Sequence, residues 1–382
     1  MRVGVDARHL AAHRGVARYS GALLDALARE FPDDRWALFV PGSAQHPAVE
    51  ALRAHPNVEV HRHRFGSRPL FGAAAVARRP RLDRLIGDPV DLIWMPAPAP
   101  VSVSGSVALV LTVQDLSFER RPRDFTPYER LWHALARPRS LARRADRVIV
   151  LAPSTGEEVG ATWGISRERI DVVAPGVALP QPTPAFELPG PYLLAVGALE
   201  PRKAPELLAA AFARARESGL HAELVFAGEG RLAGRLDGPG VHLLGQVSDD
   251  QLDALYRGAL ALVVPSLLDG YGLPLREALA RGVPAVASDL PSFGAELSPA
   301  VLRVAPGDVD ALSTALLRIR GDDALRSELA GAARGTVEGL TWEAAARGTR
   351  AVFAEVAEER DGRGRSGRKS RQRPPGREGC AD

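Results

Sequence analysis

Short apolar runs alternate along the chain with longer segments in which apolar residues recur every three or four positions. The first half holds six strand-like runs, RVGVDA, WALFV, VEVH, DLIWM, VALVLTV and DRVIVL. The second half holds six more, YLLAVG, AELVFAG, VHLLG, ALALVVP, VPAVAS and AVLRVA. Between them, segments such as RYSGALLDALAREF place Leu23, Leu24, Leu27 and Phe31 on one helical face. Strands that alternate with helices predict an α/β fold with parallel sheets covered on both sides.

A proline-rich stretch separates the two halves of this pattern. Residues 177–190 carry Pro180, Pro182, Pro184 and Pro189, a density that disfavours helix interiors and central strands. The sequence therefore predicts two doubly wound, Rossmann-like domains that face each other across a cleft, with ligands beyond the carboxyl ends of the strands. The predicted divisions are a first domain over 1–176, a linker over 177–190, a second domain over 191–340, a last helix over 341–359 and a tail over 360–382.

The last helix and the tail differ in character. Thr349, Val352 and Phe353 share an apolar face, so the helix either caps the second domain or crosses back onto the first. The tail carries a net +5 in a chain whose formal charge is +3, which leaves −2 for the rest. With almost no apolar residues the tail is expected to be disordered. It is either a solvated extension or an electrostatic arm, and the near-neutral body argues against a specific nucleic-acid partner.

Composition limits where the protein works. The only cysteine is Cys380, so no internal disulfide or cysteine-based metal site can form. No apolar run approaches the length of a membrane span, and the charged N-terminus MRVGVDARHL is unlike a secretion signal. We therefore expect a cytoplasmic protein.

A loop with two adjacent cations follows the strand-like run YLLAVG. Arg202 and Lys203 lie between that run and a helix predicted to begin near Pro205. Two cations beside a helix N-terminus favour binding of a diphosphate, because both fields are positive there. The alternative is a pair of solvated loop cations.

A glycine-rich loop follows the run ALALVVP and leads into another predicted helix. Gly270 and Gly272 allow the backbone to approach a ligand closely, and Pro274 suits the first helical position. Asp269 in the loop and Glu277 in the predicted first turn can accept hydrogen bonds from different hydroxyl groups of one ligand. Glu277 could instead only complement the helix dipole.

Several motifs together resemble retaining glycosyltransferases of family GT4, which have the GT-B fold. The segment DGYGLPLRE resembles the family's E-x7-E signature, and LEPRK resembles its diphosphate loop. The segments RVGVDARHL, RGVARYSGALLDAL, VQDLSF and RADRVIVLAPSTGEEV resemble further family motifs in the same order. The resemblance extends from Met1 to about Arg350. It implies two Rossmann-like domains, the first on the acceptor side and the second binding the nucleotide sugar.

The resemblance also implies roles for particular residues. Glu277 would hold the nucleotide ribose, while Arg202 and Lys203 would clamp the diphosphate and stabilise the charge on the leaving group. Gly15 would approach the diphosphate from the first domain. The donor sugar and its phosphate would be held by Asp269 and by the backbone of Gly270, Tyr271, Gly272 and Leu273. The family needs no metal or other cofactor besides the nucleotide-sugar co-substrate, and retention is explained by attack on the same face as the leaving phosphate.

Two positions depart from the family pattern. Asp269 replaces the first glutamate, which moves the carboxylate by roughly 1 Å. Gln114 replaces a histidine that lies near the reacting carbon of the sugar, and glutamine can donate a hydrogen bond but cannot take a proton. Asp115 remains beside it. The expected catalytic residues are Gln114, Asp115, Asp269, Arg202 and Lys203. His9 and His13 either approach the acceptor or are ordinary surface histidines.

The function expected from these residues is retaining transfer of a hexose from a nucleotide-diphosphate sugar to an unknown acceptor. GDP-mannose is the first candidate donor, because many relatives with an EPRK loop use it. One alternative is a nucleotide-sugar epimerase or hydrolase on the same fold. Another is a catalytically weak relative that binds nucleotide sugar as a sensor or scaffold, which Gln114 and Asp269 would favour.

Residues 119–147 combine charge with aromatic side chains. They hold nine arginines against four acids, interleaved with Phe125, Tyr128, Leu131, Trp132 and Leu135. One interpretation is reversible docking on an anionic membrane, where the protein would reach a lipid-linked acceptor. The other is a helix whose apolar stripe is buried against the first domain while its arginines remain solvated.

Overall fold

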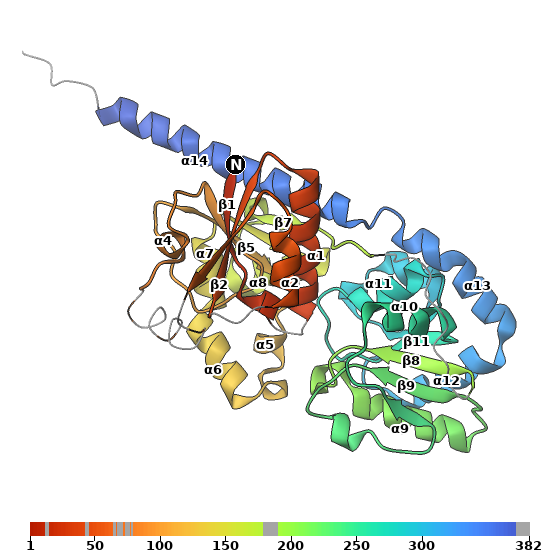
Figure 1. The fold of residues 1–382 in the computed structure, drawn as a ribbon. Helices are drawn as coiled ribbons and strands as arrows, with labels where there is room; N and C mark the ends of the chain where they lie inside the picture. Colours follow the sequence, from red (N-terminus) through yellow and green to blue (C-terminus); the bar gives the residue numbers. More distant parts are fainter. Residues whose placement is uncertain are drawn as a thin grey trace, which may run out of the picture.

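The computed structural model consists of two α/β units side by side, with a long helix along the first (Figure 1). It describes residues 1–11, 15–42, 46–63, 66, 72, 77, 79–178 and 190–371, the last eleven as backbone only. Most of the predicted linker, residues 179–189, lies outside the described residues, as do residues 372–382 of the tail.

The first sheet has seven parallel strands in the order β3-β2-β1-β4-β5-β6-β7. Six of them are the apolar runs predicted above. The seventh, β7, has only three residues and lies at the edge, which explains why its short apolar pattern gave no prediction. The strands are β1 (Arg2–Asp6), β2 (Arg35–Pro41), β3 (Val58–His63), β4 (Leu92–Met95), β5 (Ala108–Val113), β6 (Arg147–Val150) and β7 (Ile170–Val172).

The second sheet has six parallel strands in the order β10-β9-β8-β11-β12-β13. All six match predicted runs, so the predicted fold class of two doubly wound domains is confirmed. In both sheets the first three strands are added one after another toward one edge, and the later strands are added toward the opposite edge. The strand order therefore reverses between β1 and β4 in the first sheet and between β8 and β11 in the second. The strands are β8 (Tyr192–Val196), β9 (Glu223–Ala227), β10 (Val241–Leu243), β11 (Ala261–Val264), β12 (Ala285–Ser288) and β13 (Val301–Val304).

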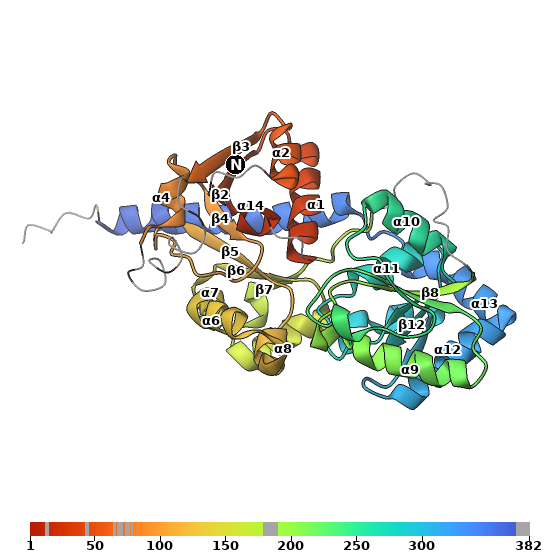
Figure 2. The ribbon, with the colours of Figure 1, turned by 60° about the horizontal axis from the view of Figure 1, so that its bottom comes forward.

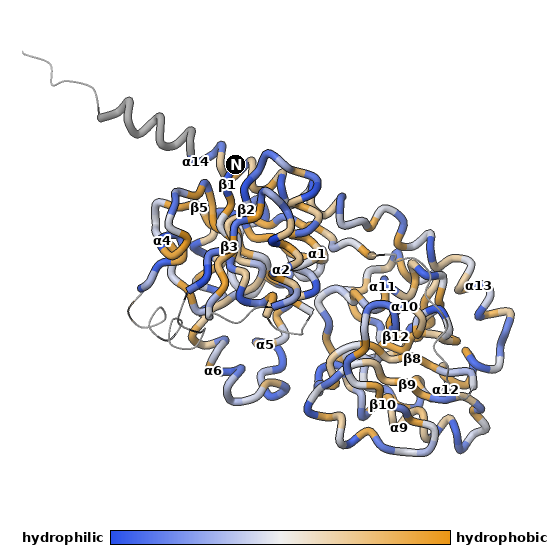
Figure 3. Tube along the Cα trace, in the orientation of Figure 1, coloured by the Kyte–Doolittle hydropathy of each residue, from blue (hydrophilic) through white to orange (hydrophobic). Residues whose placement is uncertain are grey.

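Helices cover both faces of each sheet (Figures 1 and 2). Adjacent residues of one strand enter different cores: Trp36 and Leu38 pack with α1, α2 and α14, whereas Phe39 packs with α4, α7 and α8. Figure 3 shows the apolar residues concentrated along the strands. The helices are α1 (Gly15–Glu30), α2 (Pro47–Arg53), α4 (Leu82–Ile86), α5 (Ser117–Arg120), α6 (Pro127–Ala136), α7 (Pro138–Arg144), α8 (Pro153–Trp163), α9 (Pro205–Glu217), α10 (Asp249–Gly258), α11 (Leu273–Ala280), α12 (Val309–Gly321), α13 (Asp323–Ala333) and α14 (Trp342–Arg371).

Helix α14 leaves the second domain and packs on the first. Phe353 is fully buried, with its ring centroid 6.4 Å from that of Trp36 and 5.8 Å from that of Trp94. Val352 and Val356 join the same core. Of the two arrangements left open by the sequence, the structure therefore has the helix crossing back onto the first domain.

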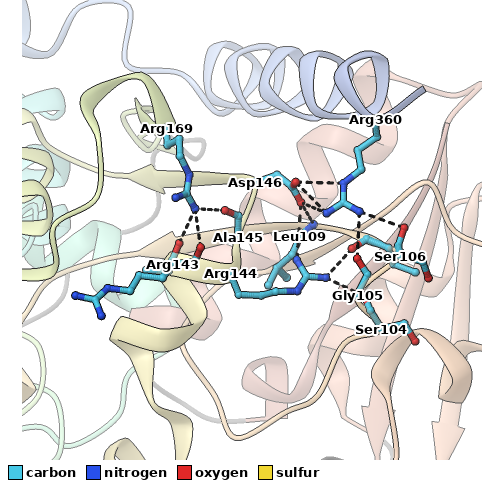
Figure 4. Close-up of polar contacts among 12 residues, drawn as sticks. Ser104, Gly105, Ser106, Leu109, Arg143, Arg144, Ala145, Asp146, Arg169 and Arg360 are labelled. Carbon is cyan, nitrogen blue, oxygen red and sulfur yellow. Dashed lines mark hydrogen bonds and ion pairs between the residues drawn. The ribbon is translucent and has the colours of Figure 1, made fainter. Parts of the chain in front are cut away.

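An arginine of the predicted tail, Arg360, lies within this helix and ties it to the first domain (Figure 4). The guanidinium of Arg360 donates to both carboxylate oxygens of Asp146, at 2.9 and 3.0 Å, and to the carbonyl oxygens of Gly105 and Ser106. Asp146 in turn accepts a hydrogen bond from the backbone N–H of Leu109. The prediction of disorder from Arg360 onward is wrong for this residue, and the helix continues to Arg371. The Arg360–Asp146 ion pair thus attaches α14 to the first domain at a position beyond the apolar face of the helix.

We predict that Phe353→Ala lowers the free energy of unfolding by about 3–5 kcal/mol, because it leaves a cavity between two tryptophans. Urea unfolding followed by tryptophan fluorescence measures the change. Glu358→Ala, at an exposed position of the same helix, is the control and should change stability by under about 0.5 kcal/mol. Equal effects of the two substitutions would show that α14 does not stabilise the first domain.

Candidate active site

The two predicted ligand loops lie side by side at the point where the second sheet reverses its strand order. One loop follows β8 and the other follows β11, and these two strands are hydrogen-bonded neighbours. The backbone N–H of Leu267 donates to the carbonyl oxygen of Arg202 at 2.8 Å, which ties the loops together. Crevices of this kind are where open α/β sheets bind their ligands.

The first ion pair of the site joins these loops. The ammonium of Lys203 contacts Asp269 Oδ2, and the backbone N–H of Gly272 donates to Asp269 Oδ1 at 3.3 Å. Burial alone would raise the pKa of the Asp269 carboxyl, but Lys203 and the nearby Arg202 hold it below its usual value. Asp269 is therefore ionised at neutral pH. The guanidinium of Arg202 forms no ion pair with any residue that the structure describes.

The second ion pair crosses between the domains. Arg18, in the first turn of α1, places Nη2 2.9 Å from Glu277 Oε1, while the hydroxyl of Tyr256 donates to Oε2 at 2.8 Å. The Glu277 side chain is only 7% exposed. The structure also corrects the position of Glu277: α11 begins at Leu273, so this glutamate is in the second turn and not in the first. Its role as a simple partner of the helix dipole is thereby excluded.

Buried polar side chains hold Glu277 in place. Two effects raise the pKa of Tyr256 well above its usual value: the burial of its phenol and the negative charge of the neighbouring Glu277 carboxylate. The hydroxyl therefore keeps its proton and remains a donor. Arg281 donates from Nη1 to the carbonyl oxygen of Glu277 at 2.8 Å and from Nε to buried Asp253 at 2.7 Å. Its guanidinium carbon lies 5.0 Å from the centroid of the Tyr256 ring. This network fixes the direction of the Glu277 carboxylate.

The first domain brings Gln114 and Asp115 to the same place. They follow β5 directly, and Asp115 accepts a hydrogen bond from the backbone N–H of Ser117 at 2.8 Å. A Cβ atom on Gly270 would overlap the carbonyl oxygen of Gln114, so only glycine allows the two loops to touch. The side-chain nitrogen of Gln114 is buried and has no hydrogen-bond partner in the described part of the chain. A ligand could satisfy this donor.

The remaining predicted residues divide between backbone and side-chain positions. The side chains of Tyr271 and Leu273 pack against the core of the first domain, and the Tyr271 hydroxyl donates to the carbonyl oxygen of Pro175 at 3.4 Å. Only the backbone of this stretch is left to contact a ligand. Gly15 begins α1 and has open space around it, one turn before Arg18. The N-terminus of α1 therefore faces the second domain.

A small cavity of about 30 Å³ lies between the two loops. It is lined by residues that include Gly197, Lys203, Ser266 and Asp269. The hydroxyl of Ser266 is buried and lacks a hydrogen-bond partner among the described residues. This volume is far below the several hundred Å³ of a typical small-molecule pocket, and the residues of the Lys203–Asp269 ion pair both line it.

Sequence reasoning missed Arg18, Tyr256 and Ser266. Arg18 stands one helical turn after Gly15, so the spacing alone could have placed it beside the predicted diphosphate. Lys203 had a signal that we did not use: the chain has 49 Lys and Arg residues, and only Lys203 and Lys369 are lysines. A lysine offers a compact point charge where arginine offers a planar fork.

Residues 119–147 form neither a wholly buried apolar stripe nor a wholly exposed aromatic face, the two arrangements considered from the sequence. Trp132 packs against the core of the first domain, with the guanidinium carbon of Arg8 5.8 Å from its ring centroid. Tyr128 and Leu131 are 52% and 56% exposed. The prediction of a buried stripe is thus correct for Trp132 and wrong for Leu131.

His9 is largely buried rather than a surface histidine, and His13 lies outside the described residues. Burial lowers the pKa of His9 to about 4, although Asp6 acts in the opposite direction. Its Nε2 has no hydrogen-bond partner in the described part of the chain. The imidazole is therefore neutral at physiological pH.

The fold and these loops define a two-domain protein of the nucleotide-sugar-binding class, and comparisons identify the family. Residues 13–180 match the family model "Glycosyltransferase Family 4", and residues 190–322 match "Glycosyl transferases group 1". The chain belongs to these group 1 glycosyltransferases of family 4. The resemblance stated from the sequence motifs is thereby confirmed.

Curated relatives share parts of the chain. O-antigen chain mannosyltransferase B of Escherichia coli is 40% identical over 105 residues, 27% of each chain. The D-inositol 3-phosphate glycosyltransferase of Frankia alni is 32% identical over 230 residues, 52% of this chain and 56% of that one. The chain thus spans about half the length, or less, of these relatives.

Solved structures match nearly the whole chain. Sucrose-phosphate synthase from Thermosynechococcus elongatus gives a TM-score of 0.70 at 21% identity, covering 93% of this chain and 98% of that one. Anabaena HepE, solved with UDP and glucose, gives 0.62 at 15% identity, covering 93% and 99%. At these identities the likeness shows the fold alone, and it confirms the GT-B architecture.

We predict that Lys203→Ala weakens binding of a nucleoside diphosphate roughly ten- to a hundredfold, the loss expected for charge-assisted contacts. Titration calorimetry measures the affinity, and circular dichroism checks that the fold is retained. Lys369→Ala, which removes the only other lysine, is the matched control. If both variants bind the diphosphate as the wild type does, Lys203 is not part of the site.

We also predict that His9 makes stability depend on pH between about 6.5 and 4. In this range the unfolded chain binds a proton that the folded protein does not, so stability falls as pH decreases. The loss attributable to His9 is roughly 3 kcal/mol for a pKa lowered to about 4. Urea unfolding at pH 7 and pH 4 should show a smaller change for His9→Gln than for the wild type. Parallel pH profiles would contradict the assignment.

Proposed function

We propose that the protein transfers a hexose, with retention of configuration, from a nucleoside diphosphate sugar to an acceptor. The observation that carries this proposal is the pair of nearly buried carboxylates at the switch point of the second sheet, Asp269 and Glu277, each in contact with a cation. Membership of the glycosyltransferase family supports it. The alternative of an epimerase or hydrolase has no comparable support.

In this proposal the donor replaces the internal partners of both carboxylates. A ribose hydroxyl takes the place of Arg18 at Glu277 Oε1, while Tyr256 keeps hold of Oε2. The diphosphate draws Lys203 away from Asp269 and also meets Arg202, which frees Asp269 to accept a hydrogen bond from the sugar. These cations stabilise the negative charge on the departing diphosphate. We propose that no metal ion is needed for this role.

The chemical step needs no side-chain base. The bond between the anomeric carbon and the diphosphate oxygen breaks, and the acceptor oxygen bonds to the same face of that carbon. The acceptor's proton passes to the departing phosphate. Gln114 cannot take this proton, but its buried amide N–H can donate to the sugar or phosphate and so position the donor.

GDP-mannose is the first donor that we propose, supported by the partial identity to a mannosyltransferase. UDP-glucose is the second, because HepE was solved with UDP and glucose. Thermal unfolding with a panel of nucleotide sugars ranks the donors, and product analysis with the best one follows. A raised melting temperature and a product with retained configuration are expected. Failure of every nucleotide sugar to raise the melting temperature would refute the proposal.

The second candidate function is donor binding without efficient transfer. The replacement of histidine by Gln114 is the observation that favours it.

Gln114→His separates the two candidates. If the enzyme has adapted to glutamine, we predict that the imidazole beside Gly270 leaves kcat unchanged or lowers it roughly tenfold. The value of kcat is measured as the rate of transfer to a good acceptor at saturating donor. Gln114→Asn is the control, because it keeps the amide group on a side chain that is one methylene shorter. A clear increase in kcat would favour the impaired relative.

We further propose that the acceptor is lipid-linked and that the protein meets it at an anionic membrane surface. The exposed Tyr128 and Leu131 beside the arginines of residues 119–147 support this. No helix among the described residues is long and apolar enough to cross a bilayer. Co-sedimentation with phosphatidylglycerol vesicles should be strong at low salt and weak at high salt. Absence of binding at low salt would favour a soluble acceptor.

A further inference from the structure

A second, larger cavity lies on the first domain. Its volume is about 550 Å³, within the range of small-molecule sites, and it lies between α5, the short helix η2 (Pro122–Asp124), α6 and α7. Aromatic rings form its apolar lining: Phe118 stacks on His133 with centroids 4.6 Å apart, and Phe125 meets the edge of His133 at 5.4 Å. These rings offer an apolar surface to a ligand.

Arginines surround this aromatic lining. Arg130, Arg137, Arg139 and Arg143 line the cavity, and Glu119 is the only acid among its lining residues. Glu119 is already engaged, since it accepts a hydrogen bond from the indole N–H of Trp163 at 2.9 Å and lies 3.5 Å from Arg139. The cavity therefore carries a net positive charge.

Two of these arginines are available to a ligand. The guanidinium groups of Arg130 and Arg137 form no ion pair with any residue that the structure describes. By contrast, Arg143 donates from Nε to the carbonyl oxygen of Trp163 at 3.2 Å. Arg130 lies in α6 and Arg137 is the residue at which α6 ends, and both line this cavity, so both can reach one anion.

The backbone at Arg137 is strained. Its φ of 48° and ψ of 55° are left-handed, a conformation that costs a non-glycine residue on the order of 1 kcal/mol or more. In the described part of the chain only Ala204 shares this property, and Ala204 follows Lys203 directly in the donor loop. At Arg137 the left-handed turn ends α6, begins α7 and brings the arginine to the cavity. Such strain concentrates at binding sites.

The cavity adjoins the acceptor side of the proposed active site. Helix α5 begins three residues after Gln114 and supplies Phe118 to the lining. In Figure 1, α5 and α6 lie at the edge of the first domain to which the strands point with their carboxyl ends. A ligand bound here would therefore be next to the cleft.

We propose that this cavity binds a phosphate ester that carries an apolar group, and that it anchors the acceptor. Arg130 and Arg137 hold the phosphate through paired N–H donors, and the rings of Phe118 and Phe125 contact the apolar group. The assignment to the acceptor rests on the proposed transfer function, whereas the binding itself does not.

Binding of octyl phosphate below its micellar concentration tests the site. Titration calorimetry compares the wild type with Arg130→Gln/Arg137→Asn, in which asparagine tolerates the left-handed backbone. Arg318→Gln, at an exposed arginine of α12, is the matched control. Affinity should fall about tenfold or more in the double variant and stay unchanged in the control. Octyl glucoside and inorganic phosphate should each bind more weakly than octyl phosphate, because each offers only one half of the ligand.

Two further measurements distinguish the source of the phosphate and isolate this proposal from the donor site. Binding to phosphatidylglycerol vesicles that falls in the double variant assigns the phosphate to a lipid; binding only of soluble octyl phosphate assigns it to a free acceptor, and either supports the site. The double variant should bind a nucleoside diphosphate as tightly as the wild type does. If neither protein binds a nucleoside diphosphate, that result contradicts the proposed transfer function and leaves the cavity proposal standing. Absent octyl phosphate binding, or equal affinity in all variants, overturns the proposed cavity ligand.

Discussion

Two nearly buried carboxylates at the carboxyl edge of the second sheet impose the main constraint on this structure. An ionised carboxylate away from water is costly unless it is paired and hydrogen-bonded. Asp269 has the ammonium of Lys203 and the N–H of Gly272, and Glu277 has Arg18 and Tyr256. Because Arg18 belongs to the first domain, neutralising Glu277 also holds the two domains together.

The contacts around this constraint make the relative position of the domains specific. Gly270 touches the backbone of Gln114, and Tyr271 enters the core of the first domain. Helix α14 leads from the second domain onto the first and is tied to the first domain by the ion pair between Arg360 and Asp146. The same interactions leave only about 30 Å³ between the donor loops. In the proposed function, donor binding exchanges these internal ion pairs for contacts with the ligand, and we expect this exchange to be coupled to domain movement.

The sequence predicted most of the fold because buried parallel strands are continuous apolar runs. It failed for β7, which is too short to show a pattern, and for Arg360, whose partner Asp146 is far away in the sequence. The two loops that follow β8 and β11 were predictable as loops because their cations, glycines and acids are local in the sequence, and their adjacency followed from the doubly wound sheet. The spacing from Gly15 could have pointed to Arg18 as a residue near the site, but the contacts of Arg18 and Tyr256 with Glu277 could not be predicted, since they depend on how distant elements pack. The position of Glu277 in the second turn was missed because the helix begins at Leu273, one residue before the start predicted at Pro274.

The central claim is that Glu277 holds the ribose of the donor. The most direct test compares the affinity of the best-binding nucleoside diphosphate with that of its 2′,3′-dideoxy analogue, in the wild type and in Glu277→Gln. The account predicts that the wild type prefers the ribose form about tenfold or more and that this preference nearly disappears in the variant. An unchanged preference in Glu277→Gln would contradict it.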